Sequence, residues 1–299
     1  MFAQRLTLLV LATLFVGPLS AFTDEQSDAV KQQKELAKAN LKSAKLTMGT
    51  GESESLLVFT PYPDEKVQTL ATNLQKTYAS ALKALKYDAT DPPYTGKLTV
   101  MIFTDPKLYK TFALVAQKRS MKPKETHDFQ LRGDTPSMTL LAGSSGKPTE
   151  ATVTAEAAKL VAAALLNNKA GTTTAYAGLP TWLETGFGNA VYLRAEGNTA
   201  KLAAHKAKIR SLNSKTSGTA LQLKYLWSDT DTPDLDTVTT SFAEYLVYGP
   251  GADKFASILS AFKPAEGNDS PTIETAFAAV EWKMPDVEQG WRKWVASSK

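Results

Sequence analysis

The sequence LPTWLETGFGNAV, at residues 179–191, decides much of the fold because it predicts a long helix in the middle of the chain. Pro180 stands where the first turn of a helix tolerates a missing N–H group. Apolar residues recur at three- and four-residue steps from Leu183 to Val191, which is the spacing of one buried helix face. The stretch therefore predicts a helix over residues 179–194 that packs against a core.

A second helix is predicted directly upstream, over residues 152–168. Its apolar positions, among them Val153, Ala157 and Leu160, follow the same helical step, and its sequence is unusually rich in alanine. The two helices are joined by AGTTTAYAG, whose glycines and small residues indicate a flexible linker. Two successive amphipathic helices therefore form the centre of the protein.

The remaining sequence predicts an α+β protein. Short apolar runs indicate strands at residues 55–60, 97–103 and 138–142. Amphipathic spacing predicts a helix over residues 64–86 and another that begins at Pro106, and the chain from residue 151 onward is predicted to be helical. We expect a small mixed sheet with helices in the N-terminal half, followed by an all-helical C-terminal half. The expected domain covers residues 53–299, with a sheet-containing part at 53–150 and a helical part at 151–299.

The stretch LPTWLETGFGNAV resembles the second active-site helix of gluzincin metallopeptidases of the peptidase MA-like kind, where L-P-x-W-L-x-E-G-x-A is usual. The upstream helix lies where those enzymes carry H-E-x-x-H. There, two histidines bind zinc, the glutamate between them activates water, and the second helix adds a carboxylate ligand. The text SFAEYLVYGPGADKFASIL and a final helix with Trp291 and Trp294 are also similar to this family. The resemblance implies a zincin-like fold.

The residues of a zinc site are not preserved on the upstream helix. Placing H-E-x-x-H there aligns it with AEAAK, so that Ala155 and Lys159 stand at the histidine positions. Glu156 remains, as a possible relic of the general base. Lys159 is either a permanent cation that pairs with a carboxylate such as Glu156 or Glu184, or a simple exposed lysine.

The second helix departs from the family pattern as well. Alignment on Trp182 places Thr185 where the ligand carboxylate is expected. Glu184 comes one residue early, rotated by about 100° around the helix, so it would serve as the ligand only if the helix shifted register. Trp182 is expected to pack in the core or to line a remaining cleft. We therefore expect no metal, no cofactor and no zinc-dependent catalysis.

Three functional hypotheses follow from these residues. The first is an exported, non-catalytic gluzincin-like protein that binds a peptide, a protein or a component of the cell envelope. The second is an active hydrolase, a peptidase for example, with an unrecognised site that uses Glu156 and Glu184. The third is a purely structural envelope protein. The two histidines, His127 and His205, lie outside both helices and are given no role.

Export is predicted from the N-terminus. Arg5 is followed by an apolar run over residues 6–16 and then by small residues, which is typical of a secretory signal cleaved near Ala21. The run is shorter than the roughly 20 apolar residues that cross a bilayer. We expect a mature protein in the periplasm or the external medium, without an integral membrane segment.

The amino-acid composition excludes some kinds of site and argues against some kinds of partner. The chain has no cysteine, so a disulfide framework and a thiolate metal site are excluded. Removal of the signal leaves 33 basic and 30 acidic residues with interspersed charges, which argues against nucleic acid as a partner. The polar segment 22–52 is expected to be a mobile or helical lead-in without a stripe to hold it to a core. Its lysines recur at helical spacing and predict a solvated face or one that meets an anionic surface: Lys31, Lys34, Lys38, Lys42 and Lys45.

Overall fold

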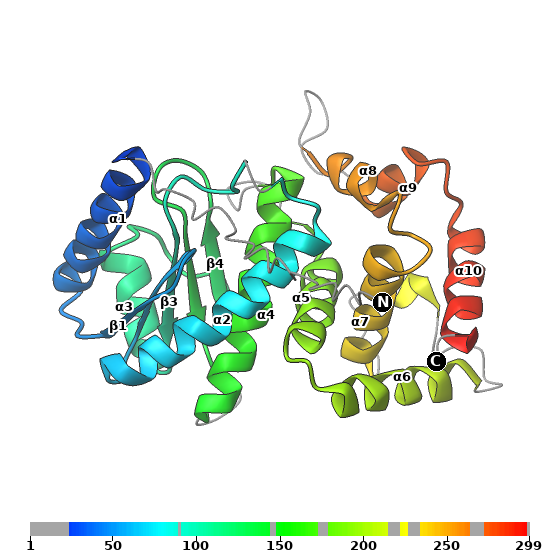
Figure 1. The fold of residues 1–299 in the computed structure, drawn as a ribbon, viewed down its shortest axis with the longest axis horizontal. Helices are drawn as coiled ribbons and strands as arrows, with labels where there is room; N and C mark the ends of the chain where they lie inside the picture. The colour runs from blue at the N-terminus through cyan, green and yellow to red at the C-terminus, as the bar shows by residue number, and fades with distance from the viewer. Residues whose placement is uncertain are drawn as a thin grey trace, which may run out of the picture.

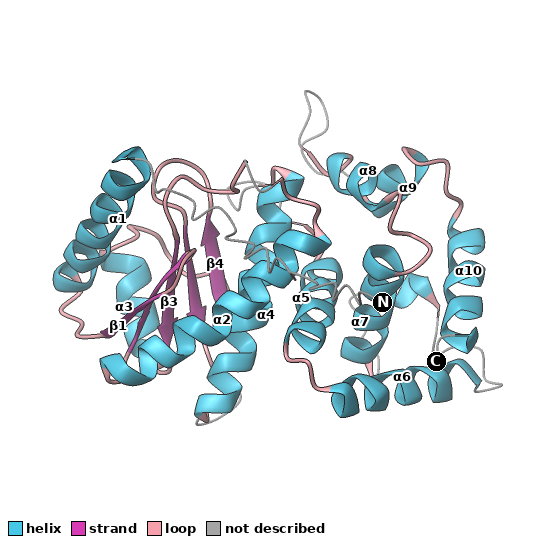
Figure 2. Cartoon of the chain, in the orientation of Figure 1, coloured by secondary structure: helices cyan, strands magenta, loops and turns pink. Residues whose placement is uncertain are grey.

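The computed structural model describes residues 24–88, 91–143, 148–172, 179–214, 222–226, 234–263 and 272–297. Within these ranges the chain combines one mixed five-stranded sheet with a larger number of helices, as Figure 2 shows, and the α+β class is confirmed. The absence of cysteine is confirmed as well. In the part of the chain that the structure describes, no helix is both long and apolar enough to cross a membrane.

The secondary-structure elements follow the chain in this order. The strands are β1 (Gly49–Glu52), β2 (Leu56–Thr60), β3 (Leu98–Phe103), β4 (His127–Gln130) and β5 (Ser137–Leu141). Helices α1 (Asp24–Ser43), α2 (Asp64–Ala84), α3 (Pro106–Val115) and α4 (Glu150–Ala170) flank the strands. The later elements are α5 (Thr181–Ala195), α6 (Thr199–Ser214), η1 (Leu223–Leu226), α7 (Leu235–Tyr248), α8 (Phe255–Ser260), α9 (Ile273–Ala278) and α10 (Met284–Ser297).

The sheet has a parallel centre and two antiparallel edges, in the order β1-β2-β3-β5-β4. Strand β3 pairs in parallel with β2 and β5, with Val100 opposite both Val58 and Met138. These central strands are buried on both faces, which explains their nearly continuous apolar sequences. Strands β1 and β4 run antiparallel to their neighbours at the two ends of the sheet.

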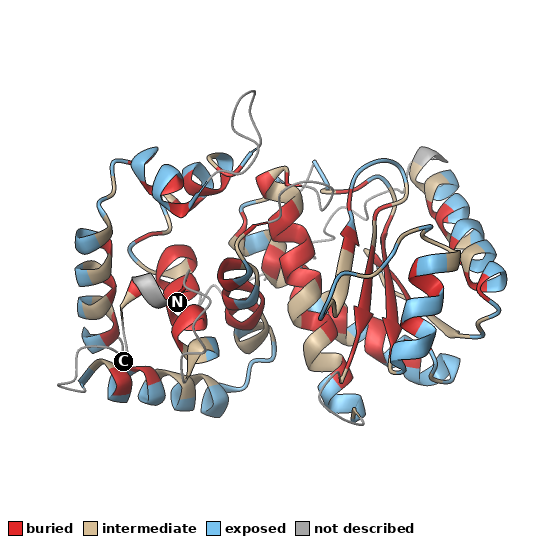
Figure 3. Cartoon of the chain, turned by 180° about the vertical axis from the view of Figure 1, so that it is seen from behind, coloured by how far each residue is buried: buried red, intermediate tan, exposed pale blue. Residues whose placement is uncertain are grey.

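Helices cover both faces of the sheet (Figures 1 and 3). Leu57 and Phe59 point to the side of α1 and α3, where they join a small apolar cluster. Leu56 and Val58 point the other way and join the main core with α2 and α4. Helix α4 packs on this second face, so it lies between the sheet and the helices that follow it.

Helix α1 is packed on the sheet, so the expectation that nothing would hold the lead-in to a core is wrong. Val30, Ala37 and Leu41 are buried against this face. Gln33 is only 1% exposed, and its amide nitrogen donates to the carbonyl oxygens of Thr95 and Asp134, both at 3.0 Å. The stripe was missed because a buried glutamine with all its hydrogen bonds made replaces one of the apolar positions.

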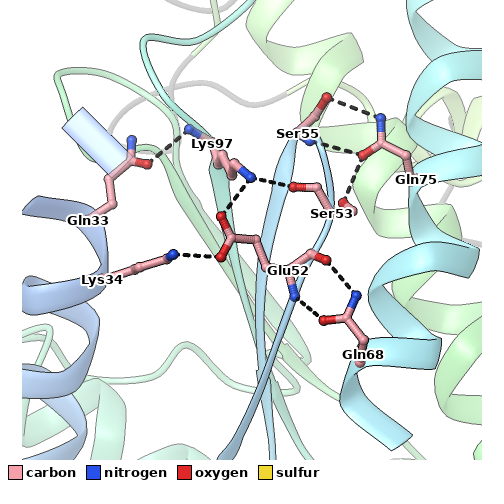
Figure 4. A network of polar contacts seen from close by, with 8 residues as sticks. All are labelled: Gln33, Lys34, Glu52, Ser53, Ser55, Gln68, Gln75 and Lys97. Atoms are coloured by element: carbon pink, nitrogen blue, oxygen red, sulfur yellow. Dashed lines mark hydrogen bonds and ion pairs between the residues drawn. The ribbon is translucent and has the colours of Figure 1, made fainter. Parts of the chain in front are cut away.

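A network of polar side chains joins α1, β1 and the start of β3 (Figure 4). Gln33 accepts a hydrogen bond from the backbone N–H of Lys97 at 2.9 Å. Glu52 pairs with the buried ammonium group of Lys97 at 2.8 Å and with Lys34. Of the five lysines in the predicted stripe, Lys34 is thus part of this network. The other four are exposed, as expected of a solvated face: Lys31, Lys38, Lys42 and Lys45.

Close helix packing around α5 depends on two glycines in the stretch LPTWLETGFGNAV. A Cβ atom on Gly188 would lie 2.6 Å from the carbonyl oxygen of Lys159 on α4. A Cβ atom on Gly186 would lie 2.4 Å from the carbonyl oxygen of Thr239 on α7. Both distances are too short for any side chain, so G-F-G lets α5 fit between α4 and α7.

Candidate functional site

A cleft of about 580 Å³ lies where α4 and α5 meet the edge of the sheet. Thr126 and His127 border it from the start of β4, and Leu140 and Leu141 from β5. Helices α4 and α5 supply most of the other lining, and Asp236 adds a carboxylate from the first turn of α7. Segments far apart in the sequence therefore converge on one concave surface, which is where ligand sites are usually found.

Most of the sequence-predicted site residues line this cleft. Glu156 and Lys159 reach it from α4, and Glu184 and Thr185 reach it from α5. Ala155 instead borders a second hollow on the outer side of α4, which also contains Glu156 and Lys159. Glu184 lines the cleft together with Thr185, its neighbour on α5.

Trp182 belongs to the core, which is the first of its two expected roles. Its side chain is 5% exposed, and its ring lies against that of Phe242 on α7, with a centroid distance of 5.5 Å. Phe242 in turn contacts Trp291 of α10 at 5.3 Å. The tryptophan therefore connects α5 to the aromatic interior of the helical half.

Glu184 is the most unusual titratable group of the cleft. Burial raises its pKa to about 7, and a hydrogen bond from Asn167 lowers it in part. The Asn167 amide nitrogen donates to Oε1 of Glu184 at 2.8 Å. Among the described residues no ion pair compensates this carboxyl group. A carboxyl that is poised between its charged and neutral forms near pH 7 is typical of functional sites.

Asn167 is held in one orientation by its other hydrogen bonds. Its amide nitrogen also donates to the carbonyl oxygen of Ala163 at 3.0 Å, one helical turn back. Its amide oxygen accepts from the hydroxyl of Thr172 at 2.8 Å and from the N–H of Leu179 at 3.5 Å. The amide therefore cannot rotate to offer its oxygen to Glu184 without losing these bonds. Sequence reasoning missed Asn167, although a polar residue within an alanine-rich helix was a usable signal.

Glu156 is held at the opposite side of the cleft. Its carboxylate accepts a hydrogen bond from the backbone N–H of Gly143 at 3.0 Å. Gly143 has a φ of 71°, a conformation that favours glycine, and it follows β5 directly. Glu156 therefore fixes the turn after β5 and at the same time faces the cleft.

Lys159 is not paired with Glu156 or Glu184 in the described part of the chain, which corrects the first of its two expected roles. Its ammonium group lies over the ring of Tyr192, 5.9 Å from the centroid. The phenol of Tyr192 donates to Glu196, which also pairs with Lys201 at 2.9 Å. The lysine is half-buried and belongs to the outer side of the cleft wall.

His127 is a cleft residue that the sequence did not reveal. Burial lowers its pKa, against a smaller opposing effect of Asp128 and Glu125. Its ring lies 5.2 Å from that of Phe129, and Nδ1 is 3.4 Å from the hydroxyl of Thr126. His127 therefore contributes a neutral imidazole at neutral pH. The prediction missed it because its position depends on β4, a short polar strand without an apolar run.

A metal-binding cluster is not found among the described residues, where no three histidine or carboxylate side chains lie close enough together to hold an ion. The predicted signal at residues 1–21 lies outside these ranges, as do residues 173–178 of the linker between the central helices. The expected absence of zinc therefore stays a prediction.

No protein-family model matches this chain, and no curated protein is significantly similar to it.

Proposed function

We propose that this chain is an exported, non-catalytic protein with a zincin-like fold, a gluzincin-like pseudo-peptidase whose cleft binds a ligand of the cell envelope. The observation that carries the proposal is the convergence of Glu156, Lys159, Glu184 and Thr185 on one cleft between two packed helices. In the metallopeptidase pattern that the sequence resembles, these positions belong to a single site. Alanine, lysine and threonine at the three ligand positions give no zinc shell.

An extended peptide is the ligand that the cleft favours. Strand β4 is the last strand of the described sheet, and its first residue, His127, lines the cleft. A sheet edge next to a concave surface offers backbone hydrogen bonds to an added strand, while the cleft receives its side chains. The site thus combines an edge for the main chain with a hollow for one or two side chains.

The test is a joint measurement of metal, turnover and binding on the purified mature protein. Zinc is quantified by mass spectrometry before and after incubation with zinc and removal of the excess, beside a known zinc peptidase. We expect no stoichiometric zinc and no cleavage of a capped peptide library, but saturable binding of some of its members. One tightly held zinc per chain together with metal-dependent cleavage would overturn the proposal.

One observation favours the hydrolase as a second candidate. Glu156 and Glu184 face the same cleft, and burial raises the pKa of Glu184 to about 7, which suits a general acid near neutral pH. Substrate profiling with peptides, esters and glycosides should then reveal turnover that both Glu156→Gln and Glu184→Gln abolish. The surface variant Glu274→Gln is the control. No turnover of substrates from any of the three classes would rule out the hydrolase in favour of the non-catalytic binding protein.

A further inference from the structure

The charges that face the cleft are unbalanced. Its titratable lining consists of the carboxyl groups of Glu156, Glu184 and Asp236, the imidazole of His127 and the ammonium group of Lys159. The imidazole is neutral at neutral pH because burial lowers its pKa. The ammonium group lies over the ring of Tyr192. Among the described residues, the cleft therefore presents three carboxyl groups and one cation, which is held at its outer wall.

Glu184 offers one oxygen atom to whatever occupies the cleft. Its Oε1 atom is an obligatory acceptor, because the fixed amide of Asn167 can only donate to it. In the described part of the chain its Oε2 atom has no hydrogen-bond partner. A half-buried carboxylate with an unused oxygen is stabilised most by a charged donor, since such hydrogen bonds are about twice as strong as neutral ones.

The wall beside these carboxyl groups is apolar. Leu140 and Leu141 come from β5, and Leu160 and Ala163 come from successive turns of α4. Such a surface suits methylene groups, in the way that lysine and arginine stems commonly lie along apolar surfaces while their charged ends reach polar groups. The cleft thus combines an aliphatic wall with carboxyl groups.

We propose that the cleft recognises an ammonium or guanidinium group on an aliphatic stem, such as the side chain of lysine or arginine in a bound peptide, and that Glu184 pairs with this cation. The inference rests on the proposed binding function and names the chemistry of its ligand. The bound cation supplies a pairing charge that Glu184 does not find among the described residues.

Pairing between Glu184 and a bound cation should make binding depend on pH, whereas binding through apolar contacts alone should not. In the free protein burial holds the pKa of Glu184 at about 7, and a paired cation stabilises the ionised form. A lysine side chain stays charged between pH 6 and pH 8. Affinity should therefore rise about tenfold from pH 6 to pH 8, and binding near pH 6.5 should release a proton.

The experiment compares capped tetrapeptides that differ at one position. The probes are acetyl-Ala-Lys-Ala-Ala-amide, the same peptide with norleucine in place of lysine, and 1-aminobutane as a free amine. Binding is followed by NMR shifts of the amide signals of residues 156, 184 and 236, and proton release by calorimetry in two buffers of different ionisation enthalpy. At pH 8 we expect the lysine peptide to bind about tenfold more tightly than the norleucine peptide.

Variants connect the effect to Glu184. Glu184→Gln should remove most of the lysine preference and the proton release, while the exposed Glu274→Gln should keep both. Circular dichroism checks that each variant is folded. Preference for the peptide over 1-aminobutane assigns the cation to a peptide side chain, whereas equal affinity assigns it to a free amine, and both outcomes keep the cation.

Two other outcomes overturn the inference and separate it from the proposed function. Equal binding of the lysine and norleucine peptides, or a lysine preference that survives in Glu184→Gln, would show that the cleft binds peptides without recognising the cation. Failure of all three probes to bind at millimolar concentration, while the capped library still yields ligands, would also refute the inference alone. Failure of the library as well would refute both.

Discussion

Glu184 and Glu244 lie on the neighbouring helices α5 and α7, and both carboxyl groups are removed from bulk water. They differ in the groups with which they pair. Glu244 is 2% exposed and pairs with Arg194 at 3.1 Å, and its other oxygen is 3.6 Å from Nε2 of His205. Burial raises the pKa of Glu244, while the charge of Arg194 opposes that rise. Among the described residues, Glu184 has one amide donor and no cation paired with it.

The difference indicates which carboxyl group serves the fold. The charge of Glu244 is compensated inside the protein, because Arg194 crosses from α5 and itself lies over the ring of Tyr248 at 4.0 Å. Glu184 keeps an unused oxygen at the cleft, and its ionised form costs stability. A group whose burial is not compensated within the fold is a candidate for function, whereas one that is paired with a cation of the fold is part of the framework.

The largest expected effect concerns Glu184 itself. Glutamine at this position keeps the acceptor for Asn167 and carries no charge. The pKa of Glu184 is about 7 in the folded protein and 4.5 in the unfolded chain, so the wild type folds with full stability below pH 4.5, where Glu184 is protonated. It loses stability as the pH rises through 7 and Glu184 ionises. Glu184→Gln should therefore be more stable than the wild type by about 3 kcal/mol at pH 8 and equal to it near pH 4. Urea unfolding at both pH values measures this, and a less stable variant at pH 8 would break the comparison.

Arg194 should show the opposite behaviour. Arg194→Met leaves the carboxylate of Glu244 buried beside an apolar side chain, and we expect a loss of about 2 kcal/mol at pH 7. The loss should shrink as the pH falls, because burial raises the pKa of Glu244 and a protonated Glu244 no longer needs the arginine. Lys201→Met is the matched control, since its pair with Glu196 is largely exposed and contributes less than about 1 kcal/mol. Equal losses in the two variants would show that Glu244 does not depend on its arginine.

Replacing Asn167 should change the pKa of Glu184. The hydrogen bond from Asn167 lowers that pKa, so Asn167→Ala should raise it further. The lost buried hydrogen bonds should also cost about 1–2 kcal/mol of stability. The carboxyl carbon signal of Glu184, followed by NMR against pH, gives the first quantity and urea unfolding the second. An unchanged titration of Glu184 would mean that the amide does not position it.

Lys159 should have the smallest effect. Its ammonium group contacts the face of Tyr192 and no carboxylate of the cleft in the described residues. Lys159→Met should therefore change stability by less than about 1 kcal/mol and leave the titration of Glu184 unchanged. A clear rise in the pKa of Glu184 in this variant would show that Lys159 does compensate the cleft.

The sequence predicted the elements whose signals are local. The three central strands have continuous apolar runs, and α4 and α5 have regular helical spacing, so all five were found close to their observed bounds. Strand β4, with the sequence HDFQ, was missed because only Phe129 of its residues is buried. Strand β1, with the sequence GTGE, also lacks an apolar run.

The candidate site was predictable only in part. The assignment of Glu156, Lys159, Glu184 and Thr185 to one site came from the resemblance to the gluzincin pattern, and the four side chains line one cleft. The contribution of His127 depends on how β4 pairs with β5, which is a long-range contact that no local pattern encodes. The orientation of Asn167 depends likewise on the two ends of the connection between α4 and α5.

The cleft holds a carboxyl group, that of Glu184, with which no cation pairs in the described part of the fold. The most direct test is a pH titration of the side-chain carboxyl carbon of Glu184 in the intact, ligand-free protein by NMR, with Glu184→Gln to assign the signal. A pKa of about 7 is the predicted result. A pKa at or below the ordinary value of 4.5 would mean that a positive charge already compensates Glu184, and would contradict the account.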